Sequence, residues 1–324
     1  MSGRQSALLI PGIILSLVLC AVARPAEAVW IWTPKTGKFV NPKYAVKDTP
    51  EEQFKFAQTF YEKKDYKRAR LEFKNLLRYY AQSAWAPEAQ IGIAKACEAE
   101  RDYYQAFLEY RKALQTYPSV TRVEEVVEHE FQIGELFLQG QKRKLLGSAE
   151  IIPAQEKSVE VFLAILEDAP YSAWGDKAQF KLGEAYRTTG DFDKSRQAFE
   201  ELLARYPNSP LVDQARFEIA MSAKRGAAPA GYDQQRADDA LKEFGKFKEQ
   251  FPQSGLQPQV EQEIRQLVEQ RAQHAYEVGQ FYERTHAATA ARIYYQDIVT
   301  NYADTSWASK AQARLQALGG TATP

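Results

Sequence analysis

The stretch YAQSAWAPEA, residues 80–89, returns three more times in related form, as APYSAWGDKA at 169–178, YPNSPLVDQA at 206–215 and YADTSWASKA at 302–311. Each copy has a large apolar residue at its sixth position and an alanine at its tenth. A proline cannot continue a helix, and a nearby Ser or Thr can cap the helix that follows. The apolar residue and the alanine lie four positions apart, so they share one face of that following helix. The phrase therefore predicts a chain of helical hairpins.

The residues between these phrases have the spacing of the tetratricopeptide repeat. In the fourth unit, Leu182-Gly183 and Tyr186 fall on the first helix, Ser195 and Phe199 on the second, and Pro207 ends the unit. The first, second and sixth units repeat this spacing. Small residues suit the points where two helices cross closely, and aromatic residues fill the space to the next hairpin. The pattern predicts an all-α fold, a tetratricopeptide-repeat superhelix (α-solenoid) of about six helical hairpins over residues 48–318.

Two units are interrupted. The third carries QGQKRKLLGSAEIIPAQEK, residues 139–157, between its helices, and the fifth carries GAAPAGYDQQ, residues 226–235. Both inserts are predicted to protrude from one edge of the stack. A tolerated insertion and a contact loop are both consistent with the first insert.

The first 28 residues have the pattern of an export signal. Arg4 supplies a positive charge, an apolar run follows, and Ala26-Glu27-Ala28 suits cleavage before Val29. An uncleaved anchor is the alternative. Cys20 raises a third option, lipidation, although Leu19 stands where a lipobox has a small residue.

Residues 29–47 are predicted to form an extended leader, and residues 319–324 a disordered tail. Trp30 and Trp32 give the leader two aromatic side chains. The leader fits a flexible tether and equally a peptide that docks on the repeats or on a partner.

The composition argues against several classes of function. Lys+Arg and Asp+Glu number 42 each, and no polybasic stretch occurs, so no strong field attracts nucleic acid. The three histidines are far apart, and no glycine-rich phosphate loop, G-x-S-x-G or H-E-x-x-H motif is present. Cys97 occupies a core position of its repeat. We therefore expect a protein that is not an enzyme, with no catalytic, metal or cofactor site.

The last repeat is similar to that of a known family. The run YEVGQFYERTHAATAARIYYQDIVTNYADTSWASKAQARL, residues 276–315, has a double alanine at Ala290-Ala291 and a Y-x-D-T phrase from Tyr302. Together with the exported start, the leader and the interrupted third unit, this run resembles the BamD-like lipoproteins of outer-membrane β-barrel assembly. The resemblance covers about residues 48–318.

The resemblance implies an exported, periplasmic scaffold associated with the outer membrane, with peripheral membrane attachment. Its C-terminal repeats would dock the barrel-inserting protein of the assembly complex, and its N-terminal repeats would receive unfolded outer-membrane chains. Many members have an arginine where this chain has Tyr294, and Arg292 lies two residues earlier. Arg292 and Tyr294 are the candidates for that docking.

Stacked hairpins present a groove that suits extended or helical peptides. By repeat geometry, the first helices of units one and two direct six side chains toward it: Phe54, Gln58, Tyr61, Ile91, Lys95 and Glu98. Phe54 and Tyr61 are the expected aromatic contacts, or else core residues.

Two other functions share the repeat phrase. One is a periplasmic coordinator of cell-wall synthesis or of the Tol–Pal envelope system, whose members usually have a coiled coil before the repeats. The other is the helical part of a cell-wall-cleaving enzyme, which would need an added catalytic domain.

Overall fold

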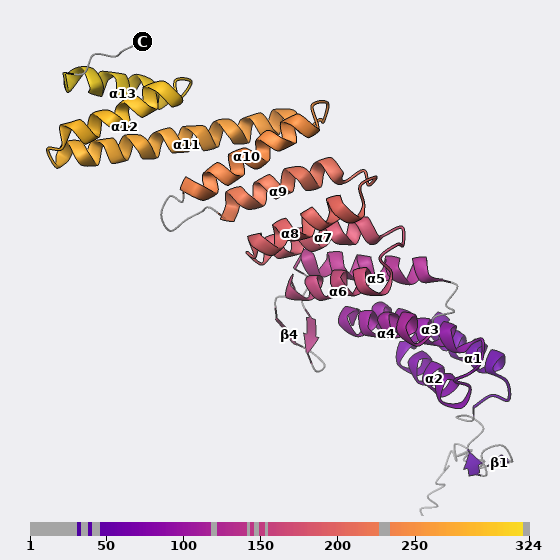
Figure 1. Ribbon diagram of the computed structural model, residues 1–324. Coiled ribbons are helices and arrows are strands. Elements are labelled where there is room, and N and C mark those ends of the chain that lie inside the picture. The colour runs from indigo at the N-terminus through magenta and orange to yellow at the C-terminus, as the bar shows by residue number, and fades with distance from the viewer. Residues whose placement is uncertain are drawn as a thin grey trace, which may run out of the picture. The chain divides into compact units, whose positions relative to one another are not determined.

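The computed structural model describes residues 31–33, 38–40, 46–117, 122–140, 143–145, 149–152, 155–226 and 234–319. This part of the chain is predominantly helical (Figure 1). Its helices, in chain order, are α1 (Pro50–Glu62), α2 (Tyr66–Tyr79), α3 (Ala86–Ala99), α4 (Tyr103–Thr116), α5 (Val123–Leu138), α6 (Gln155–Asp168), α7 (Gly175–Thr188), α8 (Phe192–Arg205), α9 (Val212–Gly226), α10 (Gln234–Gln250), α11 (Gln257–Arg284), α12 (Ala288–Asn301) and α13 (Ser306–Ala317).

The helices pair in sequence order. Six hairpins follow one another, α1–α2, α3–α4, α5–α6, α7–α8, α9–α10 and α11–α12, and α13 packs on α11 and α12. Each second helix also packs on the first helix of the next hairpin. Contacts between neighbours only are the defining property of a solenoid. The predicted all-α tetratricopeptide-repeat solenoid is thus confirmed.

The turn inside a hairpin requires one residue in the left-handed region. Lys64, Arg101 and Gly190 have φ values of 61°, 60° and 83°, and an aspartate follows each of them. The carboxylate of Asp65 accepts a hydrogen bond from the Arg68 amide at 3.2 Å, which caps α2. Asp65 and Asp191 therefore cap the second helix with a side-chain hydrogen bond, and Asp102 occupies the same N-cap position without one.

Close crossing of the two helices depends on small residues. A Cβ atom on Gly183 would lie 2.6 Å from the Phe199 ring, and one on Gly279 would lie 2.7 Å from the Tyr295 ring. Real Cβ atoms do not approach that closely, so each aromatic ring occupies the space that the glycine leaves open. The rings of Phe199 and Tyr295 are fully buried as a result.

A buried glutamine fastens the two helices in three hairpins. In each, the side-chain amide on the first helix donates to a backbone carbonyl 19 residues later, on the second: Gln53 to Glu72 (2.9 Å), Gln90 to Glu109 (3.1 Å) and Gln179 to Ala198 (2.9 Å). All three glutamines are at most 1% exposed. We call the position of this glutamine the clamp position. Its side-chain amide satisfies a buried backbone carbonyl of the opposite helix.

Two hairpins have a charged residue at the clamp position. In the fifth, Arg216 pairs with Glu243 of α10 at 2.9 Å. In the third, Glu130 takes the place of the glutamine, and neither of its carboxylate oxygens has a hydrogen-bond partner. Glu130 is fully buried.

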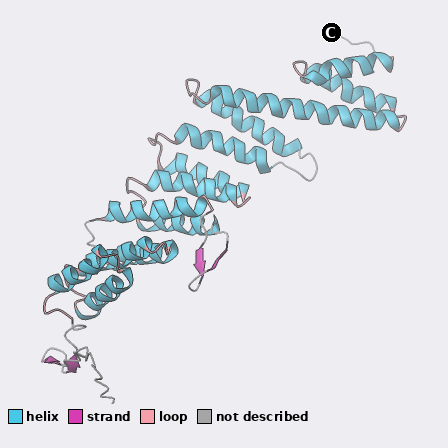
Figure 2. Ribbon diagram, turned by 180° about the vertical axis from the view of Figure 1, so that it is seen from behind, coloured by secondary structure: helices cyan, strands magenta, loops and turns pink. Residues whose placement is uncertain are grey.

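Strands occur in two small hairpins (Figure 2). β3 (Arg143–Leu145) pairs with β4 (Ala149–Ile152) inside the third-unit insert, which was expected only as a loop. β1 (Ile31–Thr33) pairs with β2 (Lys38–Val40) in the leader. The chain divides into two units between Lys47 and Asp48.

Candidate functional site

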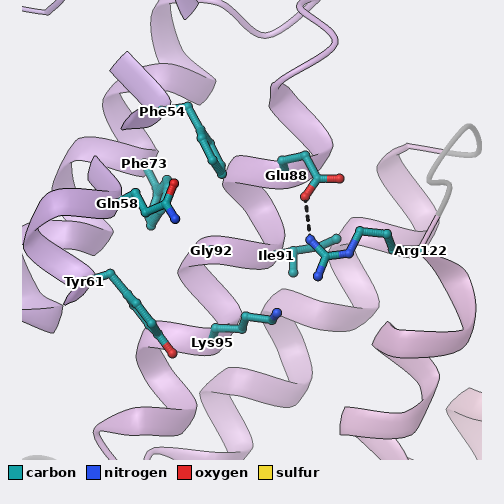
Figure 3. A pocket seen from close by; sticks show the side chains of 9 residues that line it. All are labelled: Phe54, Gln58, Tyr61, Phe73, Glu88, Ile91, Gly92, Lys95 and Arg122. Atoms are coloured by element: carbon teal, nitrogen blue, oxygen red, sulfur yellow. Dashed lines mark hydrogen bonds and ion pairs between the residues drawn. The ribbon is translucent and has the colours of Figure 1, made fainter. Parts of the chain in front are cut away.

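A pocket of about 270 Å³ opens between the first three hairpins (Figure 3). Its lining residues come from α1, α2 and α3 and from Arg122, which precedes α5: Phe54, Gln58, Tyr61, Phe73, Glu88, Ile91, Gly92, Lys95 and Arg122. Most of the lining thus comes from the first helices α1 and α3, and α2 and the start of the third hairpin contribute one residue each.

The pocket floor is apolar. The Phe54 ring lies 5.4 Å from the Phe73 ring and 4.9 Å from the Trp85 ring, between ring centroids. Ile91 is 2% exposed. Gly92 allows the Phe73 ring to pack against the α3 backbone, because a Cβ atom there would lie 2.7 Å from that ring. The floor therefore offers aromatic and aliphatic surface without a polar group of its own.

The rim is polar and internally neutralised. Lys95 donates to Glu125 at 2.6 Å, and Arg122 pairs with Glu88 at 2.9 Å and also with Glu125. Figure 3 shows Tyr61 and Lys95 at one end of the pocket, and Phe54 and Glu88 at the other. Burial raises the pKa of the Tyr61 hydroxyl, so this group stays protonated and can donate a hydrogen bond at neutral pH.

A polar cluster on Glu98 continues the same face toward α5. Tyr110 donates to the Glu98 carboxylate at 2.8 Å, and Nδ1 of His129 lies 3.0 Å from it. The His129 ring stacks on the Tyr110 ring, with 5.0 Å between centroids. Burial alone would raise the pKa of Glu98, but the interactions with His129 and Tyr110 outweigh burial and lower it. Glu98 is therefore ionised at neutral pH and holds both rings in place.

The structure brings together only some of the predicted contact residues. Phe54, Tyr61, Ile91 and Lys95 all line this pocket. Arg292 and Tyr294 lie on α12, in the sixth hairpin, and are half-buried. The Tyr294 ring stacks on Tyr282, with 5.5 Å between centroids.

The sequence reasoning missed four lining residues. The predicted contact residues did not include Phe73, Glu88, Gly92 or Arg122. Arg122 lies at the start of α5, 23 residues beyond the end of α3 and 60 residues beyond the end of α1. Only the stacking of the second and third hairpins brings it to the pocket, so no local pattern could have indicated it.

A second hollow, of about 280 Å³, lies at the other end of the repeats and is lined by Gln280, Glu283, Arg284 and Arg314. Glu283 pairs with Arg314 and accepts a hydrogen bond from Tyr295 at 3.0 Å. This hollow is polar and close to α12, the helix that carries Arg292.

Several predictions concern residues that the structure does not describe. The export signal of residues 1–28, Cys20 and most of the 319–324 tail lie outside the described residues. Within the described part, no group of three or more His, Cys, Asp or Glu side chains is arranged to hold a metal ion. Among those residues, too, no helix combines the length and the apolar character needed to cross a bilayer.

Stacked helical hairpins with a concave pocket on their first helices define a tetratricopeptide-repeat scaffold for protein interaction. The YfiO family, described as outer membrane lipoproteins, matches residues 46–128 and 152–318. The chain belongs to this family, which confirms the BamD-like resemblance. The gap in the match, residues 129–151, overlaps the third-unit insert.

Other comparisons add little. A comparison with curated proteins gives no match. Among solved structures, the chain is similar to a thermophilic tetratricopeptide-repeat protein of Thermus thermophilus (15% identity, 68% of this chain and 99% of that one, TM-score 0.32). It is also similar to a tetratricopeptide repeat protein from Parabacteroides merdae (14% identity, 76% and 91%, TM-score 0.33). We draw no functional conclusion from similarities at this level.

Proposed function

We propose that the chain is a non-catalytic periplasmic scaffold, an accessory subunit of outer-membrane β-barrel protein assembly. In this proposal the chain is exported and associates with the outer membrane. Its N-terminal repeats hold unfolded outer-membrane protein segments, and its last repeats dock the barrel-inserting protein. Membership of an outer membrane lipoprotein family supports the location and the partners.

The observation that carries the proposal is the pocket between the first three hairpins. Outer-membrane strands alternate apolar and polar side chains. An extended segment of that kind can insert an aromatic or aliphatic side chain against Phe54, Phe73 and Ile91. Its alternate polar side chains and backbone then meet Gln58, Tyr61 and the paired charges of the rim. The arrangement has no nucleophile and base in contact, so binding is the chemistry it offers.

The proposed docking surface is the outer side of α11 and α12. Phe281 and Ile293 are 54% and 65% exposed there, and Arg292 lies beside Ile293 in sequence. Exposed large apolar residues near a cation are typical of a protein interface. Arg292 and Tyr294 are therefore the residues proposed to contact the barrel-inserting protein.

Site-specific photocrosslinking in native envelopes tests both halves of the proposal. A photoreactive phenylalanine analogue replaces Gln58 at the pocket rim or Arg292 on α12, and the same analogue at exposed Gln197 on α8 is the control. We expect nascent outer-membrane proteins in the Gln58 adducts, the barrel-inserting protein in the Arg292 adducts, and neither in the Gln197 adducts. Adducts dominated by peptidoglycan synthases or Tol–Pal components would reject the assembly role and leave only the scaffold.

A substitution in the pocket separates binding from folding. Tyr61→Ala removes a half-buried ring from the rim and its contact with Tyr66, whose ring lies 5.4 Å away. We expect Tyr61→Ala to lower the yield of outer-membrane protein adducts at Gln58, with helical content unchanged. An unchanged adduct yield would mean that the segment does not pass through this pocket.

A further inference from the structure

The leader contains a small β-hairpin with an aromatic pair on one face. Trp32 on β1 lies directly opposite Phe39 on β2, and the two side chains are 51% and 64% exposed. Directly opposed residues of an antiparallel pair project from the same face. Two large rings thus share one exposed surface on a hairpin of three-residue strands.

The surrounding sequence is locally basic although the whole chain is balanced. Residues 29–46 contain Lys35, Lys38 and Lys43 and neither Asp nor Glu, whereas the whole chain has 42 residues of each sign. Trp30 and Tyr44 bring the aromatic residues of this segment to four. The leader therefore differs in character from the repeats that follow it.

These features together match a membrane interface. Tryptophan and other amphipathic rings are enriched at the level of lipid headgroups, where the ring is apolar and its edge is hydrated. Lysines near an anionic lipid surface contribute attraction that adds to burial of the rings. A short two-stranded hairpin keeps unpaired backbone groups at its edges, so it fits the hydrated headgroup region and not the hydrocarbon core.

We infer that the leader hairpin is a peripheral membrane anchor, in which Trp32 and Phe39 insert among the headgroups of a bilayer containing anionic phospholipid. The charge pattern favours lipid over protein as the occupant.

Vesicle binding by the chain from Val29 to Pro324 tests this inference. This chain keeps the whole repeat unit with its own buried core and lacks Cys20 and the apolar segment before it. Binding is measured by co-sedimentation with phosphatidylglycerol–phosphatidylethanolamine vesicles and with phosphatidylcholine vesicles. We expect binding to the anionic vesicles that weakens with added salt.

Three variants identify the groups responsible. Trp32→Ala with Phe39→Ala should lower the partition coefficient by about tenfold or more, because both rings leave the interface. Replacing Lys35, Lys38 and Lys43 by Gln should remove the preference for anionic lipid. The matched control is Tyr171→Ala, which deletes a ring that is 96% exposed on the repeats and should change nothing.

Brominated lipids give a second readout that folding defects do not imitate. Quenching of tryptophan fluorescence by lipids brominated near the headgroup should fall when Trp32 is replaced by Phe. The inference is overturned if the chain binds no vesicles, or if Trp32→Ala with Phe39→Ala binds as well as the unchanged chain. Equal binding to neutral and anionic vesicles would overturn the role of the lysines.

Discussion

Replacing Glu130 by Gln should stabilise the protein, although it removes a charge from the centre of a repeat. Glu130 occupies the clamp position of the third hairpin, where three other hairpins have a glutamine. Both of its carboxylate oxygens are buried and have no hydrogen-bond partner. Burial, and then the nearby Asp168, raise the pKa of Glu130 well above the usual carboxyl value, while Arg111 opposes them.

Arg111 stabilises the ionised form of Glu130 only weakly, because it already pairs with two other carboxylates. Its guanidinium pairs with Asp168 at 2.9 Å and with Glu167 at 2.5 Å. The ionised form of Glu130 is therefore costly, and the protonated form is the one that the fold accommodates.

The sign of the pH dependence follows from linkage. Because the pKa of Glu130 is raised on folding, the folded state holds its proton more tightly than the unfolded state does. Stability is then full below the unfolded pKa, near 4.3, and falls as the pH rises toward the folded pKa. The loss cannot exceed about 1.4 kcal/mol per pH unit for one group.

Glu130→Gln removes this penalty and restores a clamp donor. A net hydrogen bond contributes about 0.5–1.5 kcal/mol. Removing the raised pKa of Glu130 adds up to about 3 kcal/mol to the free energy of unfolding as the pH rises from 5 to 7.5. We expect a gain of about 1–4 kcal/mol at pH 7.5 that shrinks to about 0.5–1.5 kcal/mol at pH 4.5, where only the hydrogen bond contributes.

Urea unfolding at pH 4.5, 6.0 and 7.5, followed by circular dichroism, measures the gain. Since repeat proteins can unfold in steps, hydrogen exchange of the α5 and α6 amides provides a local readout. The matched control is the reverse change, Gln179→Glu, at the clamp position of the fourth hairpin; it should destabilise the protein and introduce the same pH dependence. A Glu130→Gln protein that is less stable at pH 7.5, or whose gain does not vary with pH, would refute the reasoning.

Three further predictions follow from the repeat geometry. Gly183→Ala should cost about 1–3 kcal/mol of unfolding free energy because the new methyl group overlaps the Phe199 ring, whereas Gly245→Ala, with open space around it, should gain about 0.5–1 kcal/mol; thermal unfolding of the pair checks both. Gly190→Ala should cost about 1–2 kcal/mol through backbone strain alone, since its φ is 83° and no atom lies within 4 Å of the added Cβ; urea unfolding measures it. Glu98 has a lowered pKa in the folded state, so it stabilises the fold above its unfolded pKa and this contribution is lost on acidification. The stability gap between the unchanged protein and Glu98→Gln should therefore be wide at pH 7 and narrow at pH 3.5, in denaturant titrations at the two pH values.

The sequence predicts the hairpins well because their determinants are local. The phrase ending at Ala89 or Ala178 places a helix start within a residue or two of the observed α3 and α7. The glycine at 183 and the aromatic residue at 199 indicate the crossing, since they lie at fixed offsets within one hairpin. These features depend on neighbours close in sequence, and a single chain is enough to detect them.

The clamp position could also have been predicted from the sequence. A polar residue on an otherwise apolar helix face is easily read as solvent-exposed. Gln90 and Gln179 each follow directly on the alanine that ends the phrase, so the register alone could have indicated a repeated buried amide. Glu130 stands out as an exception only when it is compared with the glutamines at the clamp position of the other hairpins.

The pocket was predicted in part, because only part of it is repeat geometry. Phe54, Tyr61, Ile91 and Lys95 lie on the first helices and face the same side by periodicity. Arg122 enters from a third hairpin, and its partner Glu88 lies 34 residues away. Such contacts depend on how far one hairpin is displaced along the next, which the sequence pattern does not specify.

Ion pairs connect successive first helices along this face. They join α3 to α5, α5 to α7, α7 to α9, α9 to α11 and α11 to α13 through Lys95–Glu125, Lys181–Glu135, Arg187–Glu218, Lys224–Glu263 and Arg314–Glu283. Each pair is partly buried and helps to fix the stacking of two hairpins, which is consistent with the balanced charge of the whole chain. Charges already engaged within the protein offer little to a charged ligand, because binding would first have to break them. The aromatic floor at Phe54 contains no such ion pairs, so under the proposed function the pocket would select a ligand by its shape and apolar area rather than by its charge.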